Sequence, residues 1–457
     1  MDFVYAFFTF YLGSIKVGLG ADSRGESMRS VGTHVMTAAA LAGGSVIAVS
    51  PVAPPPDAHI FGAVVQLATT DATGDDVALI MSGGTFLGGS NLTGTEPTSA
   101  FTTDVYDRFV DPAQPFLGQP VFPGFAPIGL ATPEQDFPLT GLNSLPFNLA
   151  VDKSVTDLNT AITQTYAGDD IVVLGYSQST AVATLEMKAL DALPADQQPS
   201  PADLHFVLLG DMNNPDGGIY ARFSFLNPYL NLTPIAALNQ PYFVATPPDT
   251  VYPTDIYTVQ YDGLADFPQY PIDIPADLNA ALGVIYSHLA YATLTPQQLA
   301  TAELLPGSAA LTGVGETNYY LIPVQHLPLL EPLYQSGVGT PLADLIAPDL
   351  TYIVNLGYDR AGPADVPTPV GLFPNVDPST VLAHLEAATV QGVNNAVADL
   401  TQPQLITAEL DQLLSLPSQI IAELPNGLAG DATALLGLLD GGLSMSTFMS
   451  DVSSLIG

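Results

Sequence analysis

The chain has 457 residues, enough for one large α/β domain with extensions or for two domains. Acidic residues outnumber basic residues 45 to 8, and a formal net charge of −37 argues strongly against binding to nucleic-acid phosphates. The absence of cysteine excludes disulfides, thiolate catalysis and cysteine-ligated metal sites, and it is compatible with an exported protein.

Residues 1–57 are predicted to be a signal-like or anchor segment. Met28 and Arg29 precede an uncharged run, Ser30–Pro56, with an Ala/Val-rich centre followed by small residues and prolines. A positive residue, an apolar centre and small residues in this order are typical of a secretory signal. We expect export, with translation starting at Met28. Because the run approaches the length that spans a bilayer, an uncleaved membrane anchor is the alternative.

Two early strands are predicted at Ala58–Gln66 and Val77–Met81. The second ends in Gly83-Gly84-Thr85, which opens a glycine-rich loop. In a serine hydrolase with a parallel sheet, the loop after an early strand supplies one backbone N–H of the oxyanion hole. Thr85 is the candidate donor here, and the two glycines would let the backbone approach the substrate oxygen.

The stretch Asp169–Leu190 predicts a nucleophile. Consecutive apolar residues lead into Gly-Tyr-Ser-Gln-Ser and then into a helix-compatible run, the strand–turn–helix layout of a nucleophile elbow. Ser177 would attack, and the N–H of Gln178 would be the second oxyanion donor. Gly175 would let strand and helix approach closely, while Ser179 stands where glycine is usual. A purely structural turn is the alternative, since G-x-S-x-S also occurs by chance.

Further segments alternate between strand and helix. Leu149–Tyr166 and Ala276–Tyr291 carry helical spacing, whereas His205–Asp211 and Asp255–Asp262 read as strands. Such alternation predicts a parallel, doubly wound sheet with helices on both faces. Phe109–Leu149, rich in proline and phenylalanine, is predicted to be an irregular loop or an apolar rim for substrate.

A serine nucleophile needs a histidine base and a carboxylate, which in this fold follow in the order serine, acid, histidine. Of the histidines after the predicted elbow, His288 is the candidate base, because His384 falls in a helical tail and His326 lies between prolines. Asp266, which lies 22 residues before His288, is the preferred acid. Asp262 and Asp211, both at strand ends, are the alternatives.

Six motifs resemble the PE-PPE C-terminal domain family of mycobacteria and relatives, over about Phe61 to Tyr358. They are GYSQS, the GGT loop, FVLLGDMNNPDGGIYARF, YPTDIYTVQYDGLADFPQYP, GVIYSHLAY and YYLIPVQHLPLLEPL. The resemblance implies a cutinase-like α/β-hydrolase with a Ser-Asp-His triad and activity on acyl esters. Some family members are acyltransferases that build acylated trehalose lipids of the cell envelope.

Carried over by motif, the resemblance assigns Ser177 as nucleophile, the ADFP aspartate Asp266 as acid and the histidine of the H-x-x-Y motif, His288, as base. The cutinase-like oxyanion position falls on Thr85, partnered by Gln178. This chemistry requires no metal or cofactor. The family's usual N-terminal PE or PPE helical domain is not recognisable, which leaves the export route open.

We therefore expect an α/β-hydrolase domain at 58–362 and a proline-rich connector with a helical C-terminal extension at 363–457. The expected function is a serine esterase acting through an acyl-enzyme on an acyl ester or glycolipid, secreted or associated with the cell envelope or membrane surface. One alternative is an acyltransferase that moves fatty acyl groups between trehalose-type glycolipids. The other is a non-catalytic envelope protein that retains the fold.

Overall fold

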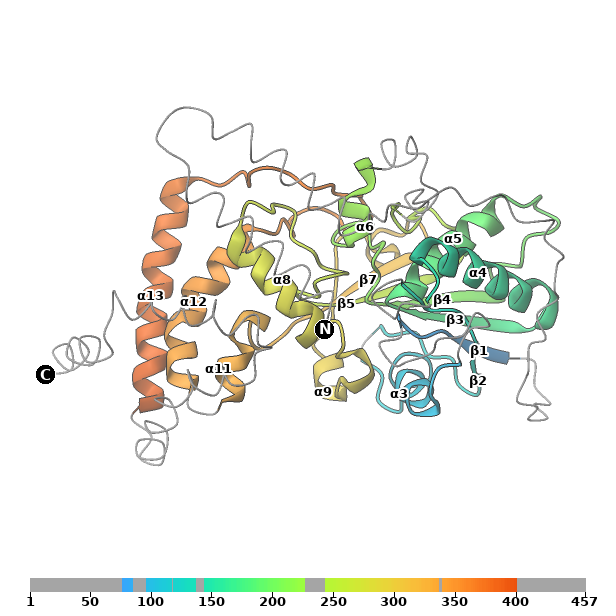
Figure 1. Ribbon diagram of the computed structural model, residues 1–457, viewed down its shortest axis with the longest axis horizontal. Coiled ribbons are helices and arrows are strands. Elements are labelled where there is room, and N and C mark those ends of the chain that lie inside the picture. The colour runs from blue at the N-terminus through green and yellow to red at the C-terminus, as the bar shows by residue number, and fades with distance from the viewer. Residues whose placement is uncertain are drawn as a thin grey trace, which may run out of the picture. The chain divides into compact units, whose positions relative to one another are not determined.

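The computed structural model describes residues 76–84, 96–116, 118–136, 144–226, 243–336 and 339–400 (Figure 1). These residues form two compact units. The first contains the described residues up to Leu329 together with Ile353–Asn375, and the second contains Leu330–Tyr352 and the residues from Val376 to 400. The predicted segment at 1–57 and the predicted strand Ala58–Gln66 lie outside the described residues.

The first unit is built on a sheet that has seven strands within the described part of the chain. Their order is β2-β1-β3-β4-β5-β7-β6, and all neighbours are parallel except β6 and β7. The strands are β1 (Asp76–Ile80), β2 (Ala126–Gly129), β3 (Asp170–Tyr176), β4 (Leu204–Leu209), β5 (Thr254–Val259), β6 (Glu303–Leu304) and β7 (Thr317–Ile322). The predicted α/β-hydrolase class, with a mainly parallel sheet flanked by helices, is confirmed.

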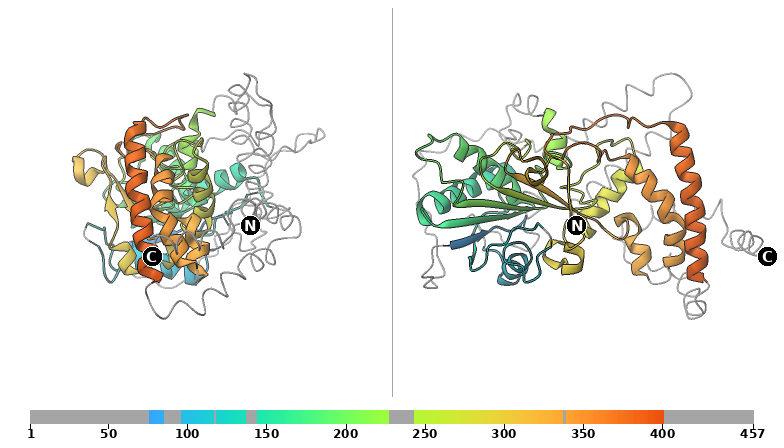
Figure 2. Two further views of the ribbon diagram at one scale, coloured as in Figure 1. Left: turned by 90° about the vertical axis from the view of Figure 1, so that its left-hand side faces the viewer. Right: turned by 180° about the vertical axis from the view of Figure 1, so that it is seen from behind.

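Helices cover both faces of this sheet. Figures 1 and 2 show α4 (Phe147–Thr160) and α5 (Gln178–Asp191) on one face and α3 (Ser99–Phe109) on the other. α4 continues as a π-helical turn, Ala161–Thr165. The other α-helices described for this unit are α6 (Ile219–Arg222), α8 (Ile274–Tyr286), α9 (Pro296–Leu299) and α10 (Ala309–Thr312).

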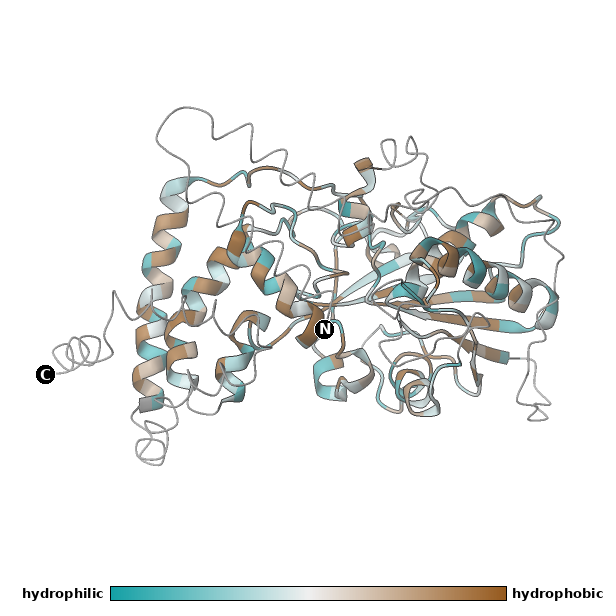
Figure 3. Cartoon of the chain, in the orientation of Figure 1, coloured by the Kyte–Doolittle hydropathy of each residue, from teal (hydrophilic) through white to brown (hydrophobic). Residues whose placement is uncertain are grey.

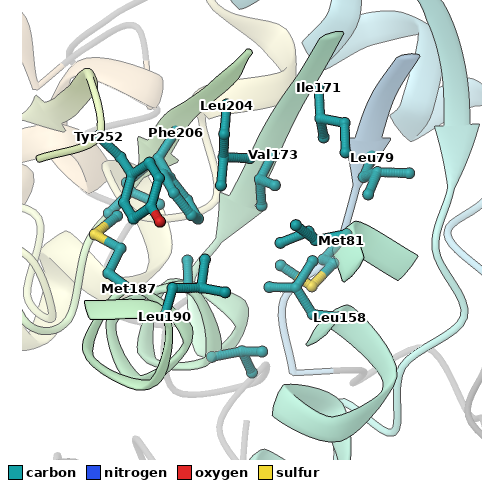
Figure 4. Packing of buried hydrophobic residues seen from close by; sticks show 14 of the residues in the cluster. Leu79, Met81, Leu158, Ile171, Val173, Met187, Leu190, Leu204, Phe206 and Tyr252 are labelled. Carbon is teal, nitrogen blue, oxygen red and sulfur yellow. The ribbon is translucent and has the colours of Figure 1, made fainter. Parts of the chain in front are cut away.

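The apolar run of β3 is buried on both faces, as its sequence predicts. Val173 faces the cluster formed with α4 and α5, where Leu158 and Met187 also lie (Figure 4). Leu174 faces the opposite cluster, which contains Phe109 of α3. Burial on both sides fixes the central strand rigidly, so the residues that follow its end are held at a defined point on the sheet edge.

The second unit is helical in its described part. It contains α11 (Glu331–Gln335), most of α12 (Thr340–Leu356) and α13 (Pro378–Leu400). Hydrophobic and hydrophilic residues alternate along α12 and α13 (Figure 3). The two helices are joined by a stacked pair, Tyr352 and His384, whose ring centroids lie 4.9 Å apart. The predicted helical C-terminal region is confirmed for this part. Within the described residues, none of the helices combines the length and apolar character needed to cross a bilayer.

The sequence analysis did not predict every element, and two strands illustrate this. Phe109–Leu149 was predicted to be irregular, yet it contains β2, which pairs with β1 at the edge of the sheet. β7 was not predicted; its sequence, TNYYLI, lacks a clear alternation and is followed directly by Pro323. Both strands obtain their stability from pairing with a neighbour distant in sequence, which a local pattern does not reveal.

Candidate active site

Ser177 lies at the sharp turn between β3 and α5. Its φ of 57° and ψ of −119° are unusual for a residue with a side chain. Backbone strain of this kind is concentrated at functional sites and persists only where the surroundings enforce it. The predicted strand–turn–helix is therefore present, with the serine at the carboxyl end of a central parallel strand.

The turn is fastened by the second serine of the motif. Ser179 is fully buried, and its Oγ accepts a hydrogen bond from Tyr176 N at 2.8 Å. A Cβ on Gly175 would come within 2.9 Å of the Ser179 carbonyl oxygen, so glycine is required there. Ser179, where glycine is usual, thus supplies a hydrogen bond that glycine would not.

His288 lies in direct contact with Ser177. Its Nε2 lies 2.7 Å from Ser177 Oγ, although the two residues are 111 positions apart. The histidine follows the end of α8, and its backbone N donates to Gly283 O at 2.8 Å. Both side chains are mostly buried, with Ser177 9% and His288 3% exposed. The predicted pairing of these two residues is present in the structure.

The carboxylate beside His288 belongs to Asp262. Its two oxygens lie 2.9 and 2.8 Å from His288 Nδ1. Oδ1 also accepts the backbone N–H groups of Leu264 and Ala265, at 2.9 and 3.1 Å. A fully buried carboxylate held by these donors can orient the imidazole and stabilise its protonated form. Asp262 was an alternative in the sequence analysis, not the preferred acid.

Asp266, the preferred acid, faces away from the histidine. Its carboxylate accepts hydrogen bonds from Nη1 and Nη2 of Arg360, each at 2.7 Å. It also accepts one from the backbone N–H of Tyr261 at 2.7 Å. Its own N–H donates to Asp262 O at 2.7 Å, which closes a turn and directs the two side chains apart. The assignment of Asp266 as the histidine's partner is therefore corrected to Asp262.

Asp211, the third candidate, is also away from His288. It is fully buried after β4, where its Oδ2 accepts from Thr246 Oγ1 at 2.7 Å and its Oδ1 accepts from Asn213 N at 2.9 Å. Burial raises the pKa of Asp211 to about 6, although these hydrogen bonds act in the opposite direction. Its contacts indicate a structural role under the elbow helix.

Two tyrosines that the sequence analysis did not assign bracket the histidine. The ring of Tyr176 stacks on His288 at 5.4 Å, and its hydroxyl donates to His288 O at 2.7 Å. Tyr291 is fully buried, donates to Asp262 Oδ2 at 2.8 Å and accepts from Val259 N at 2.9 Å. Burial, aided by the charge of Asp262, raises the pKa of Tyr291 well above its usual value, so it stays a neutral donor.

Of the two expected oxyanion donors, Gln178 lies within the described residues and Thr85 does not. Gln178 is the first residue of α5, and its side chain is tied down by a bond from Nε2 to Gln135 O at 2.9 Å. A Cβ on Gly83 would come within 2.8 Å of Ser177 Cβ, so the loop after β1 passes directly against the serine. Thr85 lies outside the described residues, and its N–H stays a predicted donor.

The loop that carries Gln135 brings two further acids near the elbow. Burial raises the pKa of Glu134 to about 8 and that of Asp136 to about 7. Thr132 Oγ1 donates to Glu134 Oε1 at 2.6 Å. Both acids therefore bind protons more tightly than exposed carboxyl groups do. Across the described residues, no three histidines or carboxylates lie close enough together to hold a metal ion.

Comparison with protein families gives one match, the PE-PPE domain, over residues 123–359. That range covers more than half of the chain and contains Ser177, Asp262 and His288. The chain belongs to the PE-PPE domain family. Within this PE-PPE chain, β1 and the Gly83 loop lie before the matched range and Arg360 lies one residue after it.

Three curated relatives of this PE-PPE chain are proteins of Mycobacterium tuberculosis strain H37Rv. Esterase PE16 is 49% identical over 65% of the chain and 53% of its own length. SL1278 acyltransferase Chp1 is 30% identical over 53% and 56%, and diacyltrehalose acyltransferase Chp2 is 28% identical over 52% and 66%. The chain spans about half the length of the curated relatives it matches most strongly. No solved structure gives a significant match.

Proposed function

We propose that this PE-PPE domain is a serine esterase that cleaves acyl esters through an acyl-enzyme intermediate. One observation carries the proposal: an unbroken hydrogen-bond chain runs from Ser177 Oγ through both imidazole nitrogens of His288 to Asp262. A serine hydroxyl is a weak nucleophile at neutral pH, and this arrangement supplies the base that it needs. The similarity to a protein named as an esterase supports the same reaction class.

In the first half-reaction, Ser177 Oγ attacks the acyl carbonyl while His288 Nε2 takes the hydroxyl proton. Asp262 stabilises the imidazolium that forms. The developing oxyanion is held by the N–H of Gln178 and, as proposed, that of Thr85. Loss of one such donor costs about 10²–10³-fold in rate. His288 then returns the proton to the leaving alcohol, which leaves the acyl group on Ser177.

In the second half-reaction, an acceptor hydroxyl attacks the acyl-enzyme and His288 again acts as the base. Water as acceptor gives an esterase, and a sugar hydroxyl gives an acyltransferase. The similarity to Chp1 and Chp2, both named acyltransferases, favours transfer to a trehalose-type glycolipid as the second candidate. An acyl ester or glycolipid is the proposed substrate in either case, and nucleic acid is not.

An active-site probe separates the enzyme from a non-catalytic envelope protein. Wild type should react covalently with a fluorophosphonate, and Ser177→Ala should not. The matched control is Ser200→Ala, because Ser200 is an exposed serine in the turn before β4. Labelling that persists in Ser177→Ala, or that is absent from folded wild type, would refute the proposal.

A partition experiment separates the two acceptors. A short-chain p-nitrophenyl ester acylates the enzyme, and the products are followed with and without trehalose or an acyltrehalose. Hydrolysis predicts free acid as the main product at every acceptor concentration. Acyl transfer predicts that the acceptor ester increases at the expense of free acid. An unchanged product ratio rejects the transferase for the acceptors tested.

We also propose that the protein is exported and acts at the cell envelope or membrane surface. The support is the signal-like pattern within residues 1–57, which lie outside the described residues. Cell fractionation followed by N-terminal sequencing of the mature chain tests this. Recovery of the intact chain only from the cytosol would contradict it.

A further inference from the structure

Arg360 and Asp266 form a forked ion pair next to the loop that carries Asp262. Nη1 and Nη2 of the arginine each lie 2.7 Å from one carboxylate oxygen. The Asp266 side chain is 5% exposed and that of Arg360 is 29% exposed. Two parallel, charge-assisted bonds fix orientation as well as distance, which a single point charge does not.

Asp266 closes the loop at both of its ends. Its Oδ2 accepts the N–H of Tyr261, and its own N–H donates to Asp262 O, both at 2.7 Å. Tyr261 has a φ of 60°, an unusual conformation for a side-chain-bearing residue. The backbone on either side of the Asp262 side chain is thus held by Asp266, and Asp266 is in turn held by Arg360.

Arg360 also contacts the loop through aromatic rings. Its guanidinium carbon lies 5.4 Å from the ring centroid of Tyr261 and 4.4 Å from that of Tyr358. The Tyr261 hydroxyl donates to Asn355 Oδ1 at 2.8 Å. Guanidinium groups favour such stacked positions over aromatic faces. Residues 355–360, almost a hundred positions later in the sequence, therefore hold in place the loop of residues 261–266, called the acid loop below.

The charge of the arginine matters as much as its shape. The chain has only 8 basic residues, and two of them, Arg222 and Arg360, pair with Asp216 and Asp266 in this region. Asp262 and Asp266 are joined by a hydrogen bond between their backbones. Arg360 therefore places a positive charge directly on the second carboxylate of the loop that also carries Asp262.

We propose that Arg360, acting through Asp266, is a positioning residue that holds the Asp262 loop in the conformation the reaction needs. This rests on the proposed function, since it assigns Asp262 as the acid of His288. It gives the ADFP aspartate a role other than acid of the triad. It also places a required residue just beyond the family match, which ends at residue 359.

The dependence of kcat/KM on pH reflects the charged and titratable groups that surround His288. Ser177, Asp262, Tyr176 and Tyr291 face or bond its ring and backbone. Asp211 lies after Gly210, which packs under the ring. None of these is a cation, so Arg360 is the compensating charge that acts through the acid loop. Its removal leaves Asp266 without a compensating charge, and this added negative charge should move the acidic limb of kcat/KM to higher pH.

The test uses Arg360→Met, which keeps the apolar stem, and Arg360→Lys, which keeps the charge but not the fork. Lys153→Met is the control, because Lys153 makes a surface pair with Asp157 on α4. The readouts are kcat/KM for a p-nitrophenyl ester across pH, the fluorophosphonate labelling rate and the thermal midpoint. Arg360→Met should lower kcat/KM by roughly 10- to 100-fold and move the acidic limb to higher pH. Arg360→Lys should keep the acidic limb of kcat/KM at its wild-type pH, but it should recover only part of the wild-type rate.

An unchanged rate and acidic limb in Arg360→Met would overturn the proposal while leaving the esterase intact. So would wild-type kcat/KM in both Arg360→Lys and Asp266→Asn while only the thermal midpoint falls. These last two variants keep the test decisive if Arg360→Met does not fold. Failure of the esterase proposal looks different, because wild type itself would then lack labelling that depends on Ser177.

Discussion

The carboxylate of Asp262 meets Nδ1 of His288 with both oxygens, at 2.9 and 2.8 Å. Asp266, four residues along the same loop, turns its carboxylate to Arg360 instead. One short loop thus presents two buried carboxylates with different partners. Because the two acids have different partners, substituting each of them should affect activity differently.

Asp262→Asn should lower kcat/KM by about 10⁴-fold, because the amide no longer stabilises the imidazolium and favours the wrong tautomer. Asp266→Asn should cost roughly 10- to 100-fold, since it disturbs only the position of the loop. Asp191→Asn, at an exposed site at the end of α5, is the control. Steady-state hydrolysis of a p-nitrophenyl ester measures all three. A larger loss in Asp266→Asn than in Asp262→Asn would reverse the assignment.

Tyr291→Phe should both slow the enzyme and destabilise it. The change removes a donor to Asp262 and leaves Val259 N without its acceptor in the core. A buried N–H left unpaired costs about 1–3 kcal/mol of unfolding free energy. With one donor fewer, Asp262 attracts the imidazole proton more strongly, so the acidic limb of kcat/KM should move to higher pH. Tyr166→Phe, at the end of the π-helical turn, is the comparison, and identical behaviour of the two variants would refute the role of Tyr291.

Gly283→Ala tests the contact between α8 and the acid loop. Alanine normally stabilises a helix interior by about 1 kcal/mol relative to glycine. Here a Cβ would come within 1.8 Å of Tyr261 O, so the helix or the loop must shift. The clash should outweigh the propensity gain, and activity should fall more than the thermal midpoint alone explains. Gly362→Ala, where a Cβ meets nothing within 4 Å, is the control. Full activity in Gly283→Ala would show that the loop tolerates the shift.

The stability of the fold should decrease as pH rises, because buried carboxyl groups bind protons more tightly in the folded state. Burial raises the pKa of Glu186 to about 7, with a side-chain bond from Asn159 acting in the other direction. Its contribution is therefore fully present below the unfolded pKa of about 4.3 and is lost as pH rises through about 7. Denaturant unfolding at several pH values measures this.

Glu186→Gln keeps the bond to Asn159 and removes the titration. It should flatten part of the pH dependence and stabilise the protein at pH 8 by up to about 3 kcal/mol. Glu96→Gln, at an exposed site, should leave the profile as in wild type. Parallel profiles for wild type and Glu186→Gln would contradict a buried carboxyl with a raised pKa.

The sequence predicts Ser177 and His288 because their signals are local: a buried strand running into G-x-S-x-S, and a histidine after a helix. It does not separate Asp262 from Asp266, because both follow the same strand and either suits the chain order. The deciding contacts are a backbone bond between the two acids and a salt bridge to Arg360, which is 94 residues away. The sequence shows Tyr291 only as the final residue of the H-x-x-Y motif, which does not indicate its bond to Asp262.

Among the strands, β3, β4 and β5 were predicted from their apolar or alternating runs. β2 and β7 were not: β2 has only four residues, β7 is followed directly by Pro323, and both depend on pairing across the sheet. Ser179 illustrates the same limit at the level of one residue. Its small size is visible in the motif, whereas its bond to Tyr176 N follows from the closed turn.

The central claim is that Ser177 is the nucleophile, and peptide mapping of the fluorophosphonate-treated protein tests it most directly. We expect one phosphonyl group per folded molecule, carried by Ser177 in the peptide from the β3–α5 turn. It should form more slowly in His288→Ala. A modification on another residue, or none on a protein that hydrolyses esters, would contradict it.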